Sequence, residues 1–212
     1  MLYIMGKAID DVAGTVLFHD DFSAPVEQNY WATDGTWWTE NNALYGRHLP
    51  NSGALLYTKK SFEGDVLMDF YGMTIAPCNN DLNFTWANRG WDEKANRVEG
   101  GYIAGLGGWW NNKVGIERYP DCKVAAASGL LLLEAGKEYH IQAGSVNGHG
   151  FIFVEGELAI EMFDSWPIVG GAVGFGAYSS FIRIRDFTLR QIVWKPDKRR
   201  YTPQFDQYTP YL

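Results

Sequence analysis

The chain has 212 residues, of which 46% are hydrophobic and only 20% are charged. This balance is typical of a folded globular protein that buries a core without disulfides or metals, and it excludes intrinsic disorder for most of the chain. The 18 basic and 25 acidic residues give a formal net charge of −7, which opposes binding to nucleic acid or to an anionic membrane. The aromatic content of 16%, together with 24 glycines, favours twisted sheets, tight turns and an aromatic-lined ligand surface.

The first residues do not have the pattern of a secretory signal. Residues 1–7 contain a short apolar run with no basic region before it, and no clear cleavage site follows. No stretch approaches the roughly 20 apolar residues of a membrane helix, and we expect a cytoplasmic protein. Cys78 and Cys122 belong to no zinc-binding pattern, so we expect free thiols, with a single bridge between them as the alternative.

Short runs with strand character follow one another along the chain, separated by turn residues. They alternate or are apolar throughout, and almost nothing has the 3.6-residue period of a helix. In chain order, we predict strands at 16–22, 43–47, 54–58, 66–71, 81–86, 102–106, 113–119, 139–143, 151–154, 158–162, 172–177 and 181–191. So many strands exceed one open sheet, and we predict an all-β sandwich of two antiparallel sheets in a single domain.

Turn residues and composition set the organisation along the chain. Asn147-Gly148 supplies the positive φ angles of a primed hairpin turn, so we expect the strands on either side to pair. No linker interrupts residues 15–192, which we take as the domain, after an N-terminal extension at 1–14. Residues 193–212 are basic and carry Tyr-Thr-Pro twice. They form either a flexible terminus or an extended arm whose tyrosines pack on the body or on a second subunit in a homo-oligomer.

Several segments taken together resemble the concanavalin A-like lectin/glucanase jelly-roll superfamily. The matching segments are 17–23, Trp31 and 37–44 near the start, 135–141 and 147–148 in a later hairpin, and 174–178 and 182–187 at the end. The overall layout, including 81–86 and 100–102, is most similar to the YesU-like proteins, a bacterial group of unknown function linked to pectin-type polysaccharide utilisation. It is more distantly similar to 3-keto-disaccharide hydrolases.

The resemblance implies a jelly roll with one convex and one concave sheet, and a glycan in the concave groove. Laminarinase-type members carry Glu-x-Asp-x-x-Glu on a catalytic strand, and this chain does not, which leaves laminarinase-like hydrolysis unsupported. Related jelly rolls hold a structural calcium where the first and last strands pair, and this implies Asp21 and Asp186 as metal ligands. Alternatively, Asp186 pairs with Arg183 or Arg185.

Two carboxylates are candidates for glycosidic cleavage, which needs a pair of them. Strand alternation directs Asp81, Asn83 and Thr85 outward from 81–86. In 113–119 it directs Glu117 outward beside Gly115, whose missing side chain leaves room for a sugar ring. We therefore predict Glu117 and Asp81 as catalytic residues. The alternative for Glu117 is an ion pair with Arg118 or a nearby lysine on an exposed strand.

An elimination reaction on a uronate-containing sugar is a second hypothesis. His140 could serve as its base and Tyr102 as its acid, with Arg89, Arg97 or Arg118 to neutralise the uronate. More simply, His140 is a polar residue on a strand.

The segment 86–110 interleaves tryptophans with amides and guanidinium groups, a combination that suits sugar rings and their hydroxyls. The predicted substrate contacts are Asn83, Trp86, Arg89, Trp91, Trp109, Trp110 and Arg118. The alternative is a second small core beneath this loop. The sequence thus predicts a protein that binds an oligosaccharide and cleaves it by hydrolysis or elimination, or else a carbohydrate-binding protein without catalysis, with no cofactor other than the calcium ion.

Overall fold

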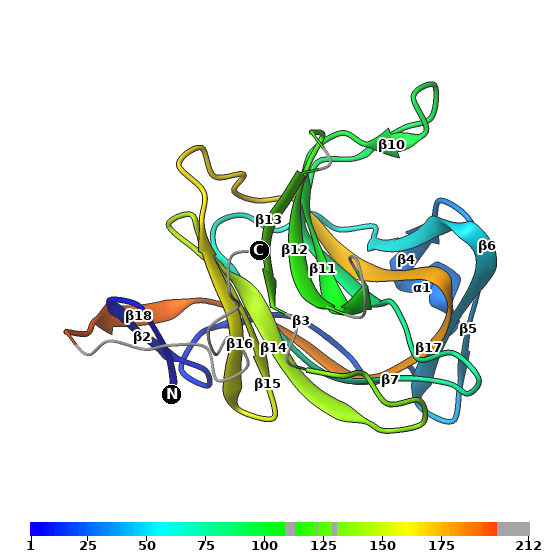
Figure 1. Cartoon of the computed structure of the whole chain (residues 1–212), viewed down its shortest axis with the longest axis horizontal. Helices are drawn as coiled ribbons and strands as arrows, with labels where there is room; N and C mark the ends of the chain where they lie inside the picture. Colours follow the sequence, from blue (N-terminus) through cyan, green and yellow to red (C-terminus); the bar gives the residue numbers. More distant parts are fainter. Residues whose placement is uncertain (109–112, 122, 129–130, 199–212) are drawn as a thin grey trace, which may run out of the picture.

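The computed structural model describes residues 1–108, 113–121, 123–128 and 131–198 (Figure 1). Within these residues the chain is built almost wholly from antiparallel strands, and the helix α1 (Val26–Asn29) is a single turn. No helix in this part of the chain has the length and apolar character needed to cross a membrane. The prediction of an all-β, single-domain sandwich is confirmed.

One layer of the sandwich carries the segments that later form the site. Its spatial order is β4 (Tyr30–Ala32), the second half of β6 (Ala43–Thr58), the first half of β17 (Ala172–Gln191), β8 (Leu82–Asn88), β11 (Gly101–Gly108), β12 (Lys113–Tyr119) and β13 (Lys123–Ser128). We call this layer the first sheet.

The second sheet forms the opposite layer. It contains β5 (Thr36–Glu40), the first half of β6, the second half of β17, β7 (Val66–Thr74), β14 (Tyr139–Val146), β15 (His149–Val154) and β16 (Glu157–Phe163), with β3 (Val16–Asp20) on the end of β17. The two long strands β6 and β17 take part in both layers, and the curved course of β17 between them is visible in Figure 1.

The core between the layers is rich in phenylalanine. Phe70 of β7 lies edge-on to Phe84 of β8 and to Phe175 of β17, with ring centroids 5.3 and 5.2 Å apart. Phe187 of β17 packs edge-on to Phe175 at 5.1 Å. All four side chains are fully buried, and their edge-to-face geometry is the one that aromatic rings prefer. The strands therefore direct every second side chain inward, as the alternation predicts.

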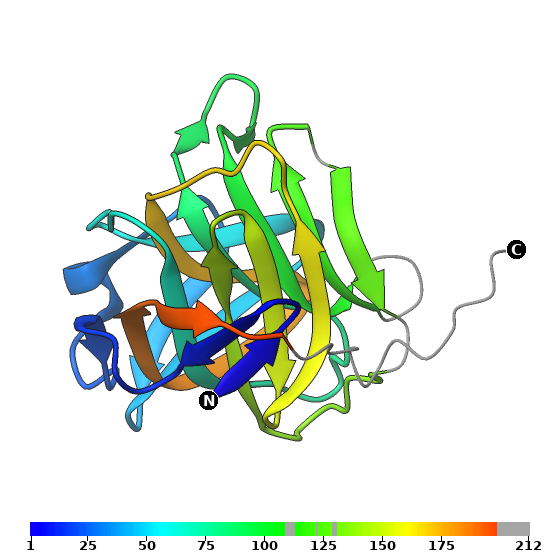
Figure 2. The same ribbon diagram turned by 90° about the vertical axis from the view of Figure 1, so that its left-hand side faces the viewer.

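The two ends of the described chain form a small sheet of their own. It consists of β1 (Leu2–Ile4), β2 (Lys7–Asp10) and β18 (Val193–Pro196). Leu2, Ile4 and Ile9 are buried against Leu67, Phe151 and other residues on the outer face of the second sheet. Figure 2 shows these strands lying across β14–β16. The predicted extension at 1–14 is thus packed on the domain, and the predicted tail begins as a strand; residues 199–212 lie outside the described part.

Several local predictions are confirmed. The hairpin turn between β14 and β15 has positive φ at Asn147 (50°) and Gly148 (74°). The meander β14–β15–β16 forms as expected, and the first long strand pairs with the last, with Asp20 opposite Phe187. Cys78 is a free thiol, whereas Cys122 lies outside the described residues.

Candidate functional site

A groove of about 600 Å³ runs over the outer face of the first sheet, the face turned away from the core. The strands β6, β17, β8, β11 and β12 provide its floor, and the segment 91–98 rises beside it. Its lining residues are Asn51, Ser52, Gly53, Ala54, Leu55, Asp81, Asn83, Trp91, Asn96, Arg97, Val98, Ile103, Glu117, Tyr119, Gly176, Ala177 and Tyr178. Of the predicted site residues, the structure therefore brings Asp81, Asn83, Trp91 and Glu117 into one groove.

The hairpin of β9 (Trp91–Asp92) and β10 (Arg97–Val98) closes one end of the groove. It continues the pairing of β8 with β11, since the backbone N–H of Arg89 donates to the carbonyl of Gly100 at 2.9 Å. Val98 is buried against Leu55 and Ile103, and Trp91 packs on the same apolar cluster while lining the groove. This apolar contact fixes the hairpin on the sheet and holds the Trp91 indole at the groove.

The other end of the groove is polar. There, β17 pairs with β6 so that Tyr178 lies opposite Gly53, and the Tyr178 hydroxyl donates to the carbonyl of Asn51 at 3.3 Å. Asp81 precedes β8 at the same end, because Leu82 is opposite Ala177. The groove therefore has an aromatic side chain near each end, Trp91 at one and Tyr178 at the other.

The Asn83 side chain forms the middle of the groove floor and is almost completely buried, with 8% exposed. Its Nδ2 donates to Asp81 Oδ1 at 3.4 Å, whereas its Oδ1 has no hydrogen-bond partner. A Cβ atom on Gly105 would lie 2.3 Å from that Oδ1, so the glycine on β11 is what makes room for the amide. A buried acceptor without a partner costs free energy, so the packing around β8 and β11 must offset this cost.

Asp81 is held beside this amide by polar contacts. Its carboxylate accepts hydrogen bonds from Asn80 Nδ2 at 3.0 Å and from Asn83. A Cβ on Gly108 would lie 2.6 Å from Asp81 Oδ1, so a second glycine leaves space for the carboxylate. Burial raises the pKa of Asp81 above its ordinary value, and the two amide donors offset only part of that effect. The third residue expected to point outward here, Thr85, is covered and donates to the carbonyl of Tyr102 at 2.7 Å.

Glu117 lies on β12, with the Tyr119 hydroxyl donating to its Oε2 at 3.0 Å. Across the sheet it is in register with Ile103 and then with Thr85, four residues from Asp81. Two strand spacings and four residues of rise separate the Cα atoms of Glu117 and Asp81 by about 16 Å. Their side chains span only part of this distance, so the carboxyl groups do not approach the roughly 5–5.5 Å separation of a retaining glycosidase.

Trp86 does not reach the groove. Its side chain is fully buried, donates from the indole nitrogen to Ser145 Oγ at 3.1 Å, and stacks on Tyr102 with ring centroids 5.4 Å apart. The alternation that directs Asn83 outward necessarily directs Trp86 inward. The other two predicted tryptophans, Trp109 and Trp110, lie outside the described residues.

Tyr102 and Arg118 also point away from the groove, since they neighbour Ile103 and Glu117 on their strands. The Tyr102 hydroxyl donates to Asp164 Oδ2 at 2.6 Å, and Arg118 Nε donates to the same oxygen at 2.7 Å. Burial of Asp164 acts to raise its pKa, but these donors and the backbone N–H of Trp166 outweigh burial and lower it. Burial and the hydrogen bond to Asp164 raise the pKa of Tyr102 to about 12. This network anchors the loop between β16 and β17, to which Arg89 also donates, at the Val169 carbonyl.

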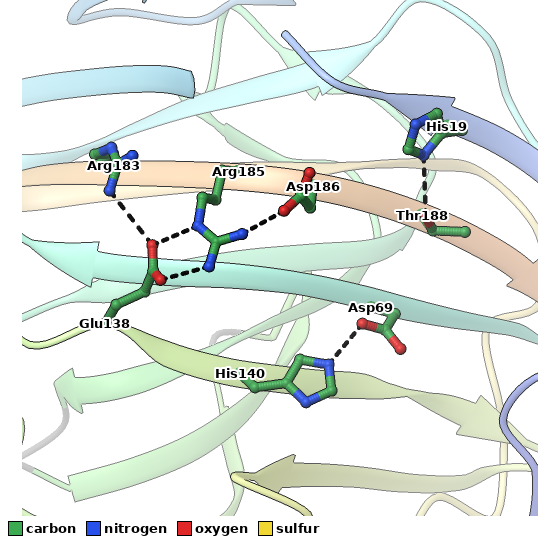
Figure 3. Close-up of polar contacts among 8 residues, drawn as sticks. All are labelled: His19, Asp69, Glu138, His140, Arg183, Arg185, Asp186 and Thr188. Carbon is green, nitrogen blue, oxygen red and sulfur yellow. Dashed lines mark hydrogen bonds and ion pairs between the residues drawn. The ribbon is translucent and has the colours of Figure 1, made fainter. Parts of the chain in front are cut away.

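His140 lies on the outer face of the second sheet (Figure 3). Its Nε2 is 2.7 Å from Asp69 Oδ1, and its ring stacks on Tyr71 with centroids 4.8 Å apart. Tyr102 belongs to the first sheet and packs into the core, so the two residues proposed for elimination lie in different layers and face different ways. His140 is therefore a polar residue in a surface network.

Asp21 and Asp186 lie near each other, because Asp20 is opposite Phe187 in the pairing of β3 with β17. Asp21 accepts a hydrogen bond from the backbone N–H of Ser23, and Asp186 forms an ion pair with Arg185, as the alternative prediction has it. Within the described residues, no group of three or more His, Cys, Asp or Glu side chains gathers for a metal. The carboxylates of Asp21 and Asp186 do not by themselves make a calcium site. The calcium ion therefore stays a prediction.

Sequence reasoning missed some groove residues. Tyr178, with 38% of its side chain exposed, and the segment 51–55 were not predicted as site residues. Alternation alone directs Tyr178 to the same face as Gly176, but what 51–55 contributes depends on the pairing of β6 with β17, more than a hundred residues away.

No protein-family model matches the chain, and neither does any curated protein. The fold is similar to that of a protein of unknown function with galectin-like fold from Bacillus subtilis, at 13% identity over 88% of this chain and 99% of that one, with a TM-score of 0.72. It is also similar to the carbohydrate binding module CBM66 from Bacillus subtilis, at 15% identity over 77% and 96% of the two chains, with a TM-score of 0.63. A prokaryotic β-1,3-1,4-glucanase (lichenase) derived from a mouse hindgut metagenome matches at 13% identity over 82% and 98%, with a TM-score of 0.55. The chain thus has a galectin-like, concanavalin-like β-sandwich fold, and membership of the YesU-like family stays a prediction.

Proposed function

We propose that this protein binds an oligosaccharide in the groove on its first sheet, without cleaving it. The single observation that carries the proposal is the groove of about 600 Å³, which combines the aromatic rings of Trp91 and Tyr178 with polar side chains on one sheet face. Sugar rings present apolar faces to indole and phenol rings, and their hydroxyls donate to buried acceptors. Solved structures with this fold include a carbohydrate binding module and a carbohydrate recognition domain, which agrees with the proposal.

The placement of the titratable groups supports binding without turnover. Glu117 and Asp81 are too far apart along the sheet for a retaining pair, and His140 does not share a face with Tyr102. The described residues therefore provide neither a retaining pair of carboxylates nor an acid and base for elimination at one sugar bond in the groove. A glycan array followed by calorimetry with the best ligand tests the binding itself.

Trp91 and Trp166 make a matched pair of variants for this experiment. Trp91 lines the groove, whereas Trp166 is 81% exposed on the loop between β16 and β17 and does not line it. Trp91→Ala should weaken binding by about 1–3 kcal/mol, or roughly 5- to 150-fold, as loss of an aromatic contact does at binding hot spots. Trp166→Ala should leave the affinity unchanged. Equal effects of the two variants would contradict the location of the site.

Mass analysis of the bound oligosaccharide after long incubation separates binding from cleavage. We expect the ligand to remain intact, and Glu117→Gln to leave the mass spectrum unchanged. Appearance of shortened products that disappear in Glu117→Gln would overturn the non-catalytic proposal and restore hydrolysis as the function.

A further inference from the structure

We infer that the groove selects uncharged or amino-bearing sugars and rejects sugars that carry a carboxylate or sulfate. The inference rests on the proposed function and deepens it by naming the ligand class.

The polar groups on the groove floor are mainly acceptors. The Asn83 amide supplies no free donor, because its Nδ2 already points to Asp81. Asp81 and Glu117 are carboxylates, which accept but do not donate when ionised. A ligand that satisfies these groups must bring donors, and sugar hydroxyls or an ammonium group provide them. A sugar carboxylate has only acceptors, so where it takes the place of a hydroxyl or an ammonium group it can form no hydrogen bond with ionised Asp81 or Glu117.

The charged side chains that line the groove also disfavour an anionic sugar. Of the described residues that line the groove, Asp81 and Glu117 are acidic, and Arg97 on the exposed side of the hairpin is the basic one. The other arginines predicted to neutralise a uronate are directed elsewhere: Arg118 pairs with Asp164, and Arg89 donates to Val169. A uronate lying over the floor would therefore face like charges in a partly water-excluded site, where repulsion is stronger than in bulk water.

The glycines of β11 show that this acceptor floor is built into the backbone. Gly105 and Gly108 leave space for the Asn83 amide and for the Asp81 carboxylate, and a Cβ at either position would collide with those oxygens. The two side chains thus keep their place at the floor without a ligand.

The test is an array that carries matched neutral, uronate, methyl-esterified uronate and amino versions of the same sugar backbones. For every backbone that binds, we expect the free uronate to bind at least about 10-fold more weakly than its neutral or methyl-esterified counterpart, a difference of about 1.4 kcal/mol. The amino version should bind at least as well as the neutral one at low salt, with the advantage reduced when salt screens the carboxylates.

A double variant identifies the cause of the selection. Asp81→Asn with Glu117→Gln removes both charges with little change of shape and should reduce the penalty for the uronate to less than about 3-fold. Glu63→Gln, an exposed acidic residue outside the groove, should keep the full penalty. Tighter binding of the uronate by the unaltered protein would overturn the inference while leaving carbohydrate binding intact. Persistence of the penalty in the double variant would refute the role of these carboxylates, and binding of no sugar at all would refute the proposed function itself.

Discussion

Glycines at the groove determine where its polar atoms can lie. Gly105 leaves the least room for a side chain, because both the Asn83 amide and the backbone carbonyl of Leu82 pack against its Cα. An added Cβ would approach these oxygens to 2.3 and 2.5 Å, distances that real contacts do not allow. The side chain could move away, but the backbone carbonyl could not move without disturbing the ladder between β8 and β11.

We therefore predict that Gly105→Ala destabilises the protein by about 1–3 kcal/mol, the range for overpacking, and abolishes ligand binding. Gly100→Ala is the matched control, because a Cβ added at Gly100 would lie 3.4 Å from Arg89 Cγ, an ordinary van der Waals distance. Urea unfolding of both variants measures the stability, and calorimetry measures the binding. A Gly105→Ala protein as stable as the control would show that the floor is adaptable.

The surface network on the second sheet allows a prediction about pH. Glu138 accepts two hydrogen bonds from Arg185, at 2.8 and 2.7 Å, and one from Arg183 at 3.3 Å (Figure 3). The hydrogen bonds from Arg185 lower the pKa of Glu138 below its ordinary value. A carboxylate with a lowered pKa in the folded state stabilises that state above the unfolded pKa of about 4.3, and this contribution is lost as the pH falls through the folded value.

Glu138→Gln should thus lower the free energy of unfolding at pH 7 by about 1 kcal/mol or less, because the pair is partly exposed to solvent. The difference from the unaltered protein should shrink as the pH falls below about 4. Chemical denaturation across a pH series measures it, with Glu63→Gln, an exposed residue, as the control. A difference that stays constant down to acid pH would show that Glu138 acts through packing and not through charge.

At the scale of elements, the sheet formed by the chain ends is a cover for apolar residues. Ile9 of β2 is fully buried against the outer face of the second sheet, where Phe151 and Phe153 would otherwise meet water. Ile9→Ala should destabilise the protein by about 2–5 kcal/mol, the range for deleting such a side chain from a core.

Val12→Ala is the matched control for Ile9→Ala, since Val12 is 72% exposed just beyond the same strand, and its change should stay within about 0.5 kcal/mol. Thermal and urea unfolding compare the two. Similar small effects would mean that the terminal sheet detaches before the domain unfolds, and that its burial contributes little to global stability.

Strand positions were predictable where a single strand shows clear alternation. The predicted run 113–119 is the strand β12 as observed, because Val114 and Ile116 alternate with residues that face the groove. The long strands β6 and β17 were each predicted as two, since Pro50 to Gly53 has the composition of a turn and Ser179 interrupts the apolar pattern. In the structure pairing continues across a bulge beside Ser179, whose φ is 48°.

The same reasoning explains which site residues were predictable. Alternation on β8 and β12 is local, and it correctly directs Asn83 and Glu117 to one face. It also directs Trp86 and Arg118 to the opposite face, so counting aromatic and basic residues in a segment overestimates the ligand contacts. The part played by 51–55 depends on contacts between distant segments, which a single sequence does not reveal.

At the scale of the whole molecule, the two sheets are not independent units. The strand β17 has 20 residues, pairs with β8 in the first sheet and with β7 in the second, and is joined to β6 in both. Phe175 and Phe187, at its two ends, touch each other in the shared core. Separation of the sheets would therefore break the pairing of one strand and divide one core.

We expect the domain to unfold in a single cooperative transition for this reason. Urea curves followed by far-UV circular dichroism and by tryptophan fluorescence should coincide, since the fully buried Trp86 reports on the core. Phe175→Leu and Phe187→Leu should shift both curves by the same amount within each variant, although the substitutions lie in different halves of β17. Two separated transitions, or a variant that moves one curve only, would show that the sheets unfold separately, and the continuity of β17 would then be a feature of topology without energetic coupling.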